Sequence, residues 1–262
     1  MSRLDIQSQH VANMDRAARA IAIAADRTGV DFDYLMNQAK VESGFRPDAK
    51  ASTSSAAGLF QFVSQTWLGT VKQHGVKHGL GWAAEAISAN GDGSFAVSDA
   101  ALRSQILNLR NQPEVASLMA AEFASDNRDA LAGALSREPQ PVDLYLAHFL
   151  GVGGATQFLK AWSVDPGQPA APLFPKAAAA NRAVFFGKDG APRSLNEIRE
   201  RFAAKMGADF TAPSPSRRQF AAVSHQSARP MQLQGFQPMP ERLSVDFAHA
   251  AYGRLSAMGA QS

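Results

Sequence analysis

The chain reads Val-Glu-Ser-Gly-Phe-Arg-Pro over residues 41–47 and Ala-Gly-Leu-Phe-Gln-Phe over residues 57–62. Apolar side chains with the spacing of one helix face precede the first stretch: Phe32, Leu35, Met36 and Ala39. Asp31 is a suitable N-cap for this helix, and Gly44 is a stop signal. The pattern therefore predicts a helix over residues 31–43, with Glu42 in its last turn.

The position of Glu42 favours a protonated carboxyl group. At the C-terminal end of a helix, the partial negative charge of unpaired carbonyl groups opposes ionisation. An apolar neighbour such as Phe45 adds a desolvation effect of the same sign. A protonated carboxyl near neutral pH is what a general acid needs. A glutamate at a helix end is more often only solvated, so this pattern alone does not establish catalysis.

Together, the two stretches resemble the soluble lytic transglycosylase domain, a lysozyme-like family that cleaves peptidoglycan. The resemblance rests on Glu-Ser-Gly-Phe-x-Pro, a Ser- and Ala-rich segment, and Gly-Leu-Phe-Gln, and it covers roughly residues 15–165. It implies a mainly α, lysozyme-like catalytic domain. It also implies that Glu42 acts first as acid and then as base, that Ser43 is its supporting hydroxyl, and that Gln61 and Phe62 contact the glycan.

A third element of that family, Ala-Tyr-Asn-x-Gly, has a partial counterpart in Ala-His-Phe-Leu-Gly at residues 147–151. His148 stands at the tyrosine place and Phe149 at the asparagine place. Tyr145 lies one helical turn before Phe149 and can present its hydroxyl from the same side. Both Tyr145 and His148 are therefore candidates for binding substrate and assisting Glu42.

For such a domain, the resemblance implies cleavage of the β-1,4 bond between N-acetylmuramic acid and N-acetylglucosamine, with formation of 1,6-anhydro ends. Glycosidases of the usual kind need two carboxylates, and near Glu42 the sequence offers only Asp48. Two alternatives stay open: a hydrolytic muramidase, and an inactive glycan-binding or scaffold module of a wall-spanning machine. The departures at His148 and Phe149 motivate the second alternative.

Composition excludes several other classes of protein. The 262 residues can form one large domain or two small ones. The lack of cysteine excludes disulfides, thiolate metal sites and cysteine nucleophiles, and no apolar run reaches membrane-spanning length. The excess of positive charge falls on residues 211–262, so no basic, aromatic-containing face for nucleic acid is predicted on the folded part. We expect no cofactor and no membrane insertion.

The sequence predicts a helix-rich chain in three parts: a lysozyme-like transglycosylase domain at 1–165, a Pro/Ala-rich linker with a small helical extension at 166–210, and a flexible, disordered basic tail at 211–262. Helices are predicted at residues 13–28, 31–43, 64–74, 99–110, 113–127, 128–136, 141–149, 152–162 and 194–206.

Some residues invite a second interpretation. Residues 88–99 partly match a calcium-binding loop, but Ser88 and Asp99 stand where Asp and Glu are usual. We therefore predict no metal site but a Gly-rich turn that closes a short hairpin, with Asp99 capping the next helix. For the three tryptophans, core packing is favoured over sugar stacking. Glu122 is predicted to be solvated.

A wall-cleaving enzyme must reach the wall, and residues 20–25 form a poor signal peptide, better explained as part of an amphipathic helix. We therefore expect periplasmic action or export by a specialised flagellar or secretion apparatus; a phage-encoded origin also fits. Five apolar residues of the tail lie near one face of a potential helix: Leu243, Phe247, Ala250, Ala251 and Leu255. This pattern predicts a segment that binds a protein of such an apparatus, the alternative being a dispensable solvated tail.

Overall fold

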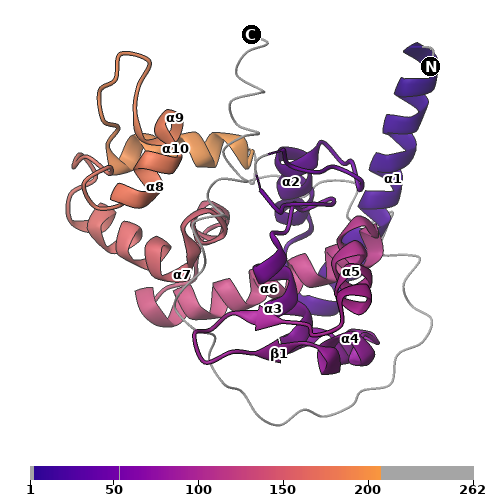
Figure 1. The fold of residues 1–262 in the computed structure, drawn as a ribbon. Helices are drawn as coiled ribbons and strands as arrows, with labels where there is room; N and C mark the ends of the chain where they lie inside the picture. The colour runs from indigo at the N-terminus through magenta and orange to yellow at the C-terminus, as the bar shows by residue number, and fades with distance from the viewer. Residues whose placement is uncertain (1–2, 53, 208–262) are drawn as a thin grey trace.

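The computed structural model describes residues 3–52 and 54–207, with the side chains of residues 3–6 left aside. In this part, ten α-helices, two 3₁₀ turns and one hairpin follow one another (Figure 1), so the mainly α class is confirmed. Their bounds are α1 (Arg3–Thr28), α2 (Phe32–Ser43), α3 (Ser64–His74), η1 (Val76–His78), α4 (Gly81–Ala86), β1 (Ser88–Ala89), β2 (Phe95–Ala96), α5 (Ala100–Asn108), η2 (Leu109–Asn111), α6 (Pro113–Leu135), α7 (Pro141–Val164), α8 (Pro175–Ala180), α9 (Arg182–Phe185) and α10 (Leu195–Lys205). The tail at 211–262 lies outside the described residues.

Helix α2 begins and ends where its capping residues predict. The Asp31 side chain accepts a hydrogen bond from the Tyr34 N–H at 2.9 Å, which satisfies one of the free donors of the first turn. Gly44 adopts a left-handed conformation (φ 58°), and its N–H donates to the Lys40 carbonyl at 3.0 Å, as a helix-ending glycine does. Glu42 therefore lies in the last turn, as predicted.

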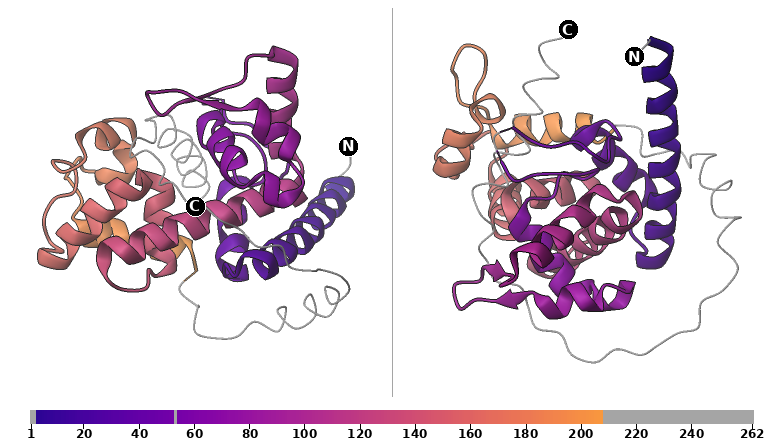
Figure 2. Two further views of the ribbon diagram at one scale, coloured as in Figure 1. Left: turned by 90° about the horizontal axis from the view of Figure 1, so that it is seen from below. Right: turned by 45° about the vertical axis from the view of Figure 1, so that its right-hand side comes forward.

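Helices α1 and α6 pack along each other and form the frame of the molecule. Helix α1 begins ten residues earlier than predicted, and residues 7–12 are exposed where it projects beyond the body (Figure 2). Helix α6 is one continuous helix from Pro113, which was predicted as a helix start. The predicted break after residue 127 is wrong, because Asn127 and Leu131 are both buried and hold this helix against the core.

Helix α7 changes direction at Gly151, where φ is 74° and ψ is 163°. Only glycine adopts this conformation without strain. The break separates the two helices predicted at 141–149 and 152–162. The first half carries Tyr145 and His148 towards α2, and the second half packs against the segment that follows.

The predicted helical extension packs on the same core as the helices before it. Phe158 of α7 lies 6.0 Å from Phe174 between ring centroids. Phe202 of α10 contacts Tyr145 and Phe149 edge to face, at 5.2 and 5.1 Å. Helix α10 starts with a capping box between Ser194 and Glu197. The hydrophobic core is thus continuous across residue 165.

Residues 88–99 form the predicted hairpin. Ser88 pairs with Ala96 and Ala89 with Phe95, and Asp99 caps α5 by accepting from the Leu102 N–H. Within 3–52 and 54–207 there is no cluster of His, Cys, Asp or Glu that could hold a metal. No helix in the same ranges is long and apolar enough to cross a membrane.

The three tryptophans differ in burial. Trp67 is fully buried, and its indole N–H donates to the Ile106 carbonyl at 2.8 Å. Trp162 is half-buried, donates to Asn196 at 3.1 Å and lies under the guanidinium of Arg199. Core packing is therefore confirmed for Trp67, whereas Trp82 is 46% exposed, contrary to the prediction.

Candidate active site

Glu42 is buried at the C-terminal end of α2, with 2% of its surface exposed. One carboxylate oxygen, Oε1, lies 3.1 Å from Nε2 of His148 on α7. The imidazole is also buried. The structure thus brings together the predicted acid and one of its two predicted assistants, which stand 106 residues apart in the sequence.

Two ionisable side chains near this pair have pKa values shifted mainly by burial. Burial, reinforced by the charge of Glu42, raises the pKa of Tyr34 above its usual value. Burial and the neighbouring charge of Arg201 lower the pKa of Lys205 to about 8, and Glu42 partly offsets this by attracting the ammonium. Helix α10 therefore brings a cation close enough to interact with Glu42. The sequence motifs gave no sign of this residue, because only tertiary packing brings α10 to α2.

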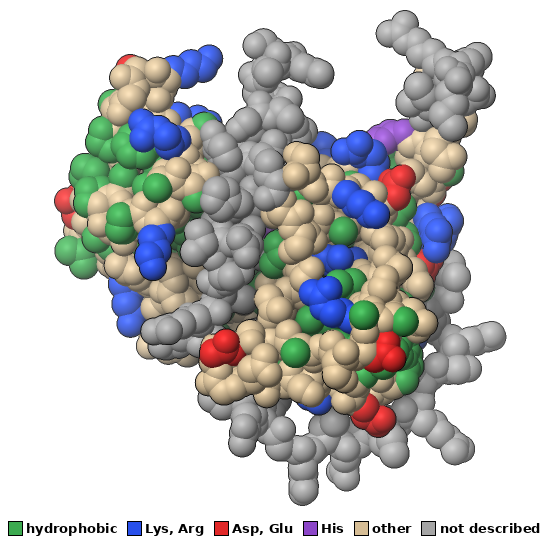
Figure 3. Space-filling model, viewed as in Figure 1, with side chains coloured by type: hydrophobic (Ala, Val, Ile, Leu, Met, Phe, Trp, Pro, Cys, Tyr) green, Lys and Arg blue, Asp and Glu red, His purple; other side chains and the backbone are tan. Residues whose placement is uncertain are grey.

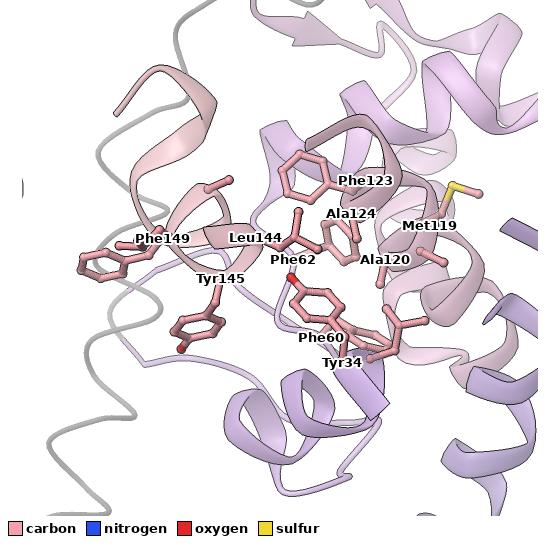
Figure 4. Packing of buried hydrophobic residues seen from close by; sticks show 14 of the residues in the cluster. Tyr34, Phe60, Phe62, Met119, Ala120, Phe123, Ala124, Leu144, Tyr145 and Phe149 are labelled. Atoms are coloured by element: carbon pink, nitrogen blue, oxygen red, sulfur yellow. The ribbon is translucent and has the colours of Figure 1, made fainter. Parts of the chain in front are cut away.

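The imidazole of His148 is held on two further sides. The Gln38 side-chain nitrogen Nε2 lies 3.1 Å from His148 Nδ1. The ring of Tyr145 stacks on the imidazole with centroids 5.7 Å apart and planes 21° from parallel. Figure 4 shows Tyr145 and Phe149 side by side on α7. Whether Tyr145 or His148 assists Glu42 in catalysis stays a prediction, but His148 is within hydrogen-bond distance of it.

The hydroxyl of Ser43 joins the two sequence motifs. It lies 2.8 Å from the Leu59 carbonyl and 3.2 Å from the Ala39 carbonyl, and it accepts from the Arg46 N–H at 3.2 Å. A hydroxyl has one proton and two acceptor positions, so these contacts occupy it with backbone groups. The predicted role of Ser43 beside Glu42 stays untested; its observed contacts fix the loop of residues 57–62 to the end of α2.

Gln61 and Phe62 shape that loop from within. Gln61 has a left-handed backbone (φ 49°), and its side-chain amide donates to the Ala49 and Gly58 carbonyls, both at 2.8 Å. Phe62 is 5% exposed and packs edge to face on Trp67, with ring centroids 5.2 Å apart. Their predicted glycan contacts remain predictions. Both side chains pack within the protein, and every residue of the loop 57–62 is buried.

Arg110 is a residue that sequence reasoning missed. Its guanidinium is buried and donates to the carbonyls of Ser55 at 2.7 Å, Phe62 at 2.9 Å and Leu107 at 2.8 Å. Burial, helped by the charge of Arg103, lowers its pKa to about 10. An isolated arginine far from both motifs carries no local signal of such a role. Its contacts join the Ser- and Ala-rich stretch, at Ser55, to the end of the second motif, at Phe62.

Gly58 permits the close approach of this loop to Arg110. Its φ is 82°, and a Cβ atom here would lie 1.9 Å from the Arg110 carbonyl oxygen. Any larger residue would therefore move the loop away from η2. The Gly-Leu-Phe-Gln motif thus needs its glycine for the backbone path as well as for packing.

Three carboxylates are buried within the described ranges: Glu42, Glu122 and Asp143. Asp143 is bound by Arg137 and Arg199, at 2.8 and 3.2 Å. The carboxylate of Glu122 is bound by three basic side chains: Lys77 and His78, both at 2.7 Å, and His74 at 3.2 Å. The prediction of a solvated Glu122 is wrong, because the spacing of residues on α6 does not show what covers it.

On the face shown in Figure 3, the charged side chains of the described residues do not form a stripe. Figure 3 shows Lys and Arg side chains scattered over the visible face, both over α8–α10 and over the part built from α2–α5. Glu114 of α6 is half exposed and pairs with Arg16 of α1 at 3.0 Å. Asp48, the other acid near Glu42 in the sequence, is exposed.

Residues 19–80 match the family model of the transglycosylase SLT domain. The matched segment begins inside α1, contains Glu42 and the loop of residues 57–62, and ends ahead of α4. It confirms the resemblance seen in the sequence and the lysozyme-like class of the fold. The match supports a peptidoglycan-acting function of the lytic transglycosylase type, exercised in the periplasm or outside the cell. His148 and Lys205 lie outside the matched segment.

Proposed function

We propose, from the transglycosylase SLT domain that this chain carries, that it cleaves the β-1,4 bond between N-acetylmuramic acid and N-acetylglucosamine and leaves 1,6-anhydro ends. The observation that carries the proposal is Glu42: a buried carboxyl group at a helix end, with one oxygen at hydrogen-bond distance from an imidazole. Burial and the helix end both favour its neutral form. Glu42 is then the general acid.

In the first step, protonated Glu42 gives its proton to the glycosidic oxygen, and the bond from this oxygen to C1 of the muramic residue breaks. The substrate's own acetamido oxygen forms a bond to C1 and supports the positive charge. The N-acetylglucosamine end leaves as an alcohol. A hydrogen bond from the imidazole to Oε1 stabilises the carboxylate that Glu42 becomes, since hydrogen bonds to an ionised group are the stronger ones.

In the second step, the Glu42 carboxylate removes the proton from the C6 hydroxyl of the same muramic residue. The C6 oxygen bonds to C1, and the bond from C1 to the acetamido oxygen breaks. The anhydro ring closes without water, and Glu42 regains its proton. One side chain serves as acid and then as base.

The surroundings of Glu42 favour this single-acid route over one that needs two carboxylates. Glu122 and Asp143, the other buried carboxylates of the described ranges, are each bound by basic side chains. Asp48 is exposed beyond the end of α2. Neither the buried, paired carboxylates nor the exposed Asp48 is suited to attack C1 or to activate a water beside Glu42.

Replacing Glu42 by Gln tests the proposal, because the amide keeps the size of the side chain but cannot donate the proton. We expect the rate of digestion of purified sacculi to fall by about 10²- to 10⁴-fold, while sacculus binding is retained. Glu114→Gln removes an exposed carboxylate and serves as the matched control, with activity close to that of the unmodified chain.

Mass spectrometry of the products identifies the reaction. Anhydro muramic ends, which lack one water relative to hydrolysed ends, support the transglycosylase. Reducing muramic ends as the main product would identify a hydrolytic muramidase. If both the unmodified chain and Glu42→Gln bind sacculi but neither digests them, the protein is a glycan-binding scaffold.

For residues 211–262, we propose a role in delivery. The sequence of this segment combines an excess of arginine with apolar residues near one face of a potential helix, a pattern typical of segments that fold on a partner. Its partner would be a protein of the flagellar or secretion apparatus that carries the enzyme to the wall. Deletion of the segment separates the two roles, since digestion belongs to the body and recruitment to the tail.

A further inference from the structure

Gln38 lies beside the proposed acid but belongs to neither sequence motif. It stands four residues before Glu42 on α2, so both side chains lie on the same helix face and both reach His148. Gln38 is 4% exposed. The hydrogen bonds run from Gln38 to one nitrogen of the imidazole and from the other nitrogen to Glu42.

The chemistry of an amide nitrogen decides the direction of these bonds. A side-chain NH₂ group only donates, so Nδ1 of His148, 3.1 Å away, must be the acceptor and carry no proton. In a neutral imidazole the proton is then on Nε2, which donates to Oε1 of Glu42 at 3.1 Å. The stacked ring of Tyr145 keeps the imidazole in this plane.

We propose that Gln38 is a positioning residue that holds His148 as the Nε2–H tautomer and so directs a hydrogen-bond donor at Oε1 of Glu42. This inference rests on the proposed function and deepens it. When Nε2–H occupies Oε1, the proton of neutral Glu42 is confined to the other oxygen, Oε2. The opposite tautomer would present a bare Nε2, which would accept the Glu42 proton and withhold it from the glycosidic oxygen.

Gln38→Glu reverses the direction of the bond. A carboxylate only accepts, so it requires a proton on Nδ1 of His148. The negative charge of the new carboxylate favours an imidazolium, and the imidazolium favours ionised Glu42. The Gln38→Glu variant therefore loses its general acid at a lower pH than the unmodified protein. An adjacent cation displaces the titration of a carboxyl by about one to three pH units, so we expect the alkaline limb of the activity profile to move to lower pH by such an amount.

Other titratable groups face this pair and need their own control. Tyr34 lies on α2 and Tyr145 on α7, and α10 contributes Lys205 together with Arg201. The pKa of Lys205 is about 8, so its titration can overlap the alkaline limb. The profile is therefore measured with Lys205→Met as well, and the displacement caused by Gln38→Glu should appear in both backgrounds.

The tautomer itself is measured by nitrogen NMR of the imidazole rings in the full chain, with the His148 signal identified by its loss in His148→Gln. We expect a protonated Nε2 and a bare Nδ1 in the unmodified protein, and a protonated Nδ1 in Gln38→Glu. Gln38→Met, which removes the donor but keeps the length, should show both tautomers and a smaller loss of rate. This variant keeps the test informative if the buried carboxylate of Gln38→Glu prevents folding.

Gln65→Glu is the matched control, because it makes the same replacement on α3, where the amide binds the backbone of Phe95. It should leave the His148 spectrum and the alkaline limb in place. A proton on Nδ1 in the unmodified protein, or an alkaline limb that Gln38→Glu does not move, would overturn the inference. If the expected spectra are found but no anhydro products form, the proposed function fails while the role of Gln38 in setting the tautomer stands.

Discussion

At the scale of single residues, the three buried carboxylates differ in the groups that bind them. Glu122 is surrounded by Lys77, His78 and His74, and His74 also contacts Asp126 at 2.8 Å. Burial alone would raise the pKa of Glu122, but the hydrogen bonds from His78 and Lys77 and the nearby charges outweigh it and lower the pKa to about 2. A carboxylate held in this way stabilises the fold, whereas Glu42 is the carboxyl group proposed to give up and regain a proton.

We expect the contribution of Glu122 to stability to depend on pH in a defined direction. Because its pKa falls from 4.5 to about 2 on folding, its contribution is complete above 4.5 and is lost as the pH falls towards 2. One pKa unit corresponds to about 1.4 kcal/mol, which sets an upper value of about 3 kcal/mol. Glu122→Gln should therefore lower the free energy of unfolding near neutral pH and flatten its decline in acid.

Chemical denaturation at a series of pH values measures this effect. The exposed Glu114→Gln is the control and should change the free energy of unfolding by less than about 1 kcal/mol. An equally steep acid decline in Glu122→Gln and in the unmodified protein would show that other carboxylates determine the acid stability.

At the scale of elements, the loop between α2 and α3 is held partly by one side chain that is distant in the sequence. Arg110 of η2 donates to the carbonyls of Ser55 and Phe62. These bonds add to those inside the loop, where the Ala57 N–H donates to Phe62 at 3.1 Å, the Gly58 N–H to Ala49 at 2.8 Å, and the Gln61 side chain to Ala49 and Gly58. A residue outside the matched segment thus helps to position the second motif.

Arg110→Met should loosen this loop, because it leaves buried carbonyl groups without their donor. We expect a loss of about 3 kcal/mol in the free energy of unfolding, with faster hydrogen exchange at the amides of Ala57 and Gly58. The matched control is Arg103→Met, which removes an exposed arginine near the same site. Unchanged exchange in the loop of Arg110→Met would show that Ser43 and Gln61 hold it without the guanidinium.

The sequence predicted those elements whose signals are local. Asp31, Gly44, Asp99 and Pro113 mark helix ends at the observed places, because capping depends on neighbouring backbone groups. Gly151 could likewise be read as the break in α7. The continuity of α6 and the short helices α4, α8 and α9 could not be predicted, since burial by distant segments decides the first and a helix of about one turn has no periodic pattern.

The candidate site was likewise predictable only where its residues belong to local sequence motifs. The motifs identified Glu42 and placed Tyr145 and His148 near it. They did not show Gln38, which a helix pattern presents as an ordinary polar residue, nor Arg110 and Lys205, which tertiary packing brings from distant parts of the chain. Residues that act through a second side chain leave no motif of their own.

At the scale of the whole molecule, the segment after α7 completes the core around the site. Phe174 stacks on Phe158, and Phe185 and Phe202 cover Phe149. The Met206 carbonyl accepts from the Asn37 side chain at 2.8 Å, which ties the end of α10 directly to α2. We therefore propose that the folding unit extends to residue 207 rather than ending with the motif-bearing region.

Two shortened chains test this proposal together with the proposed role of the tail. A chain ending at Phe210 keeps every residue of the core described above, so we expect it to unfold at the same temperature as the full chain and to digest purified sacculi at the same rate. It should lose localisation to the apparatus that delivers the enzyme. A chain ending at Asp165 exposes Phe149 and Phe158, and burying an aromatic side chain is worth several kcal/mol, so it should not unfold cooperatively. If the chain ending at Phe210 still localises, the tail is dispensable. If that chain unfolds, residues 211–262 pack on the body. If the chain ending at Asp165 is stable, the domain boundary lies at residue 165.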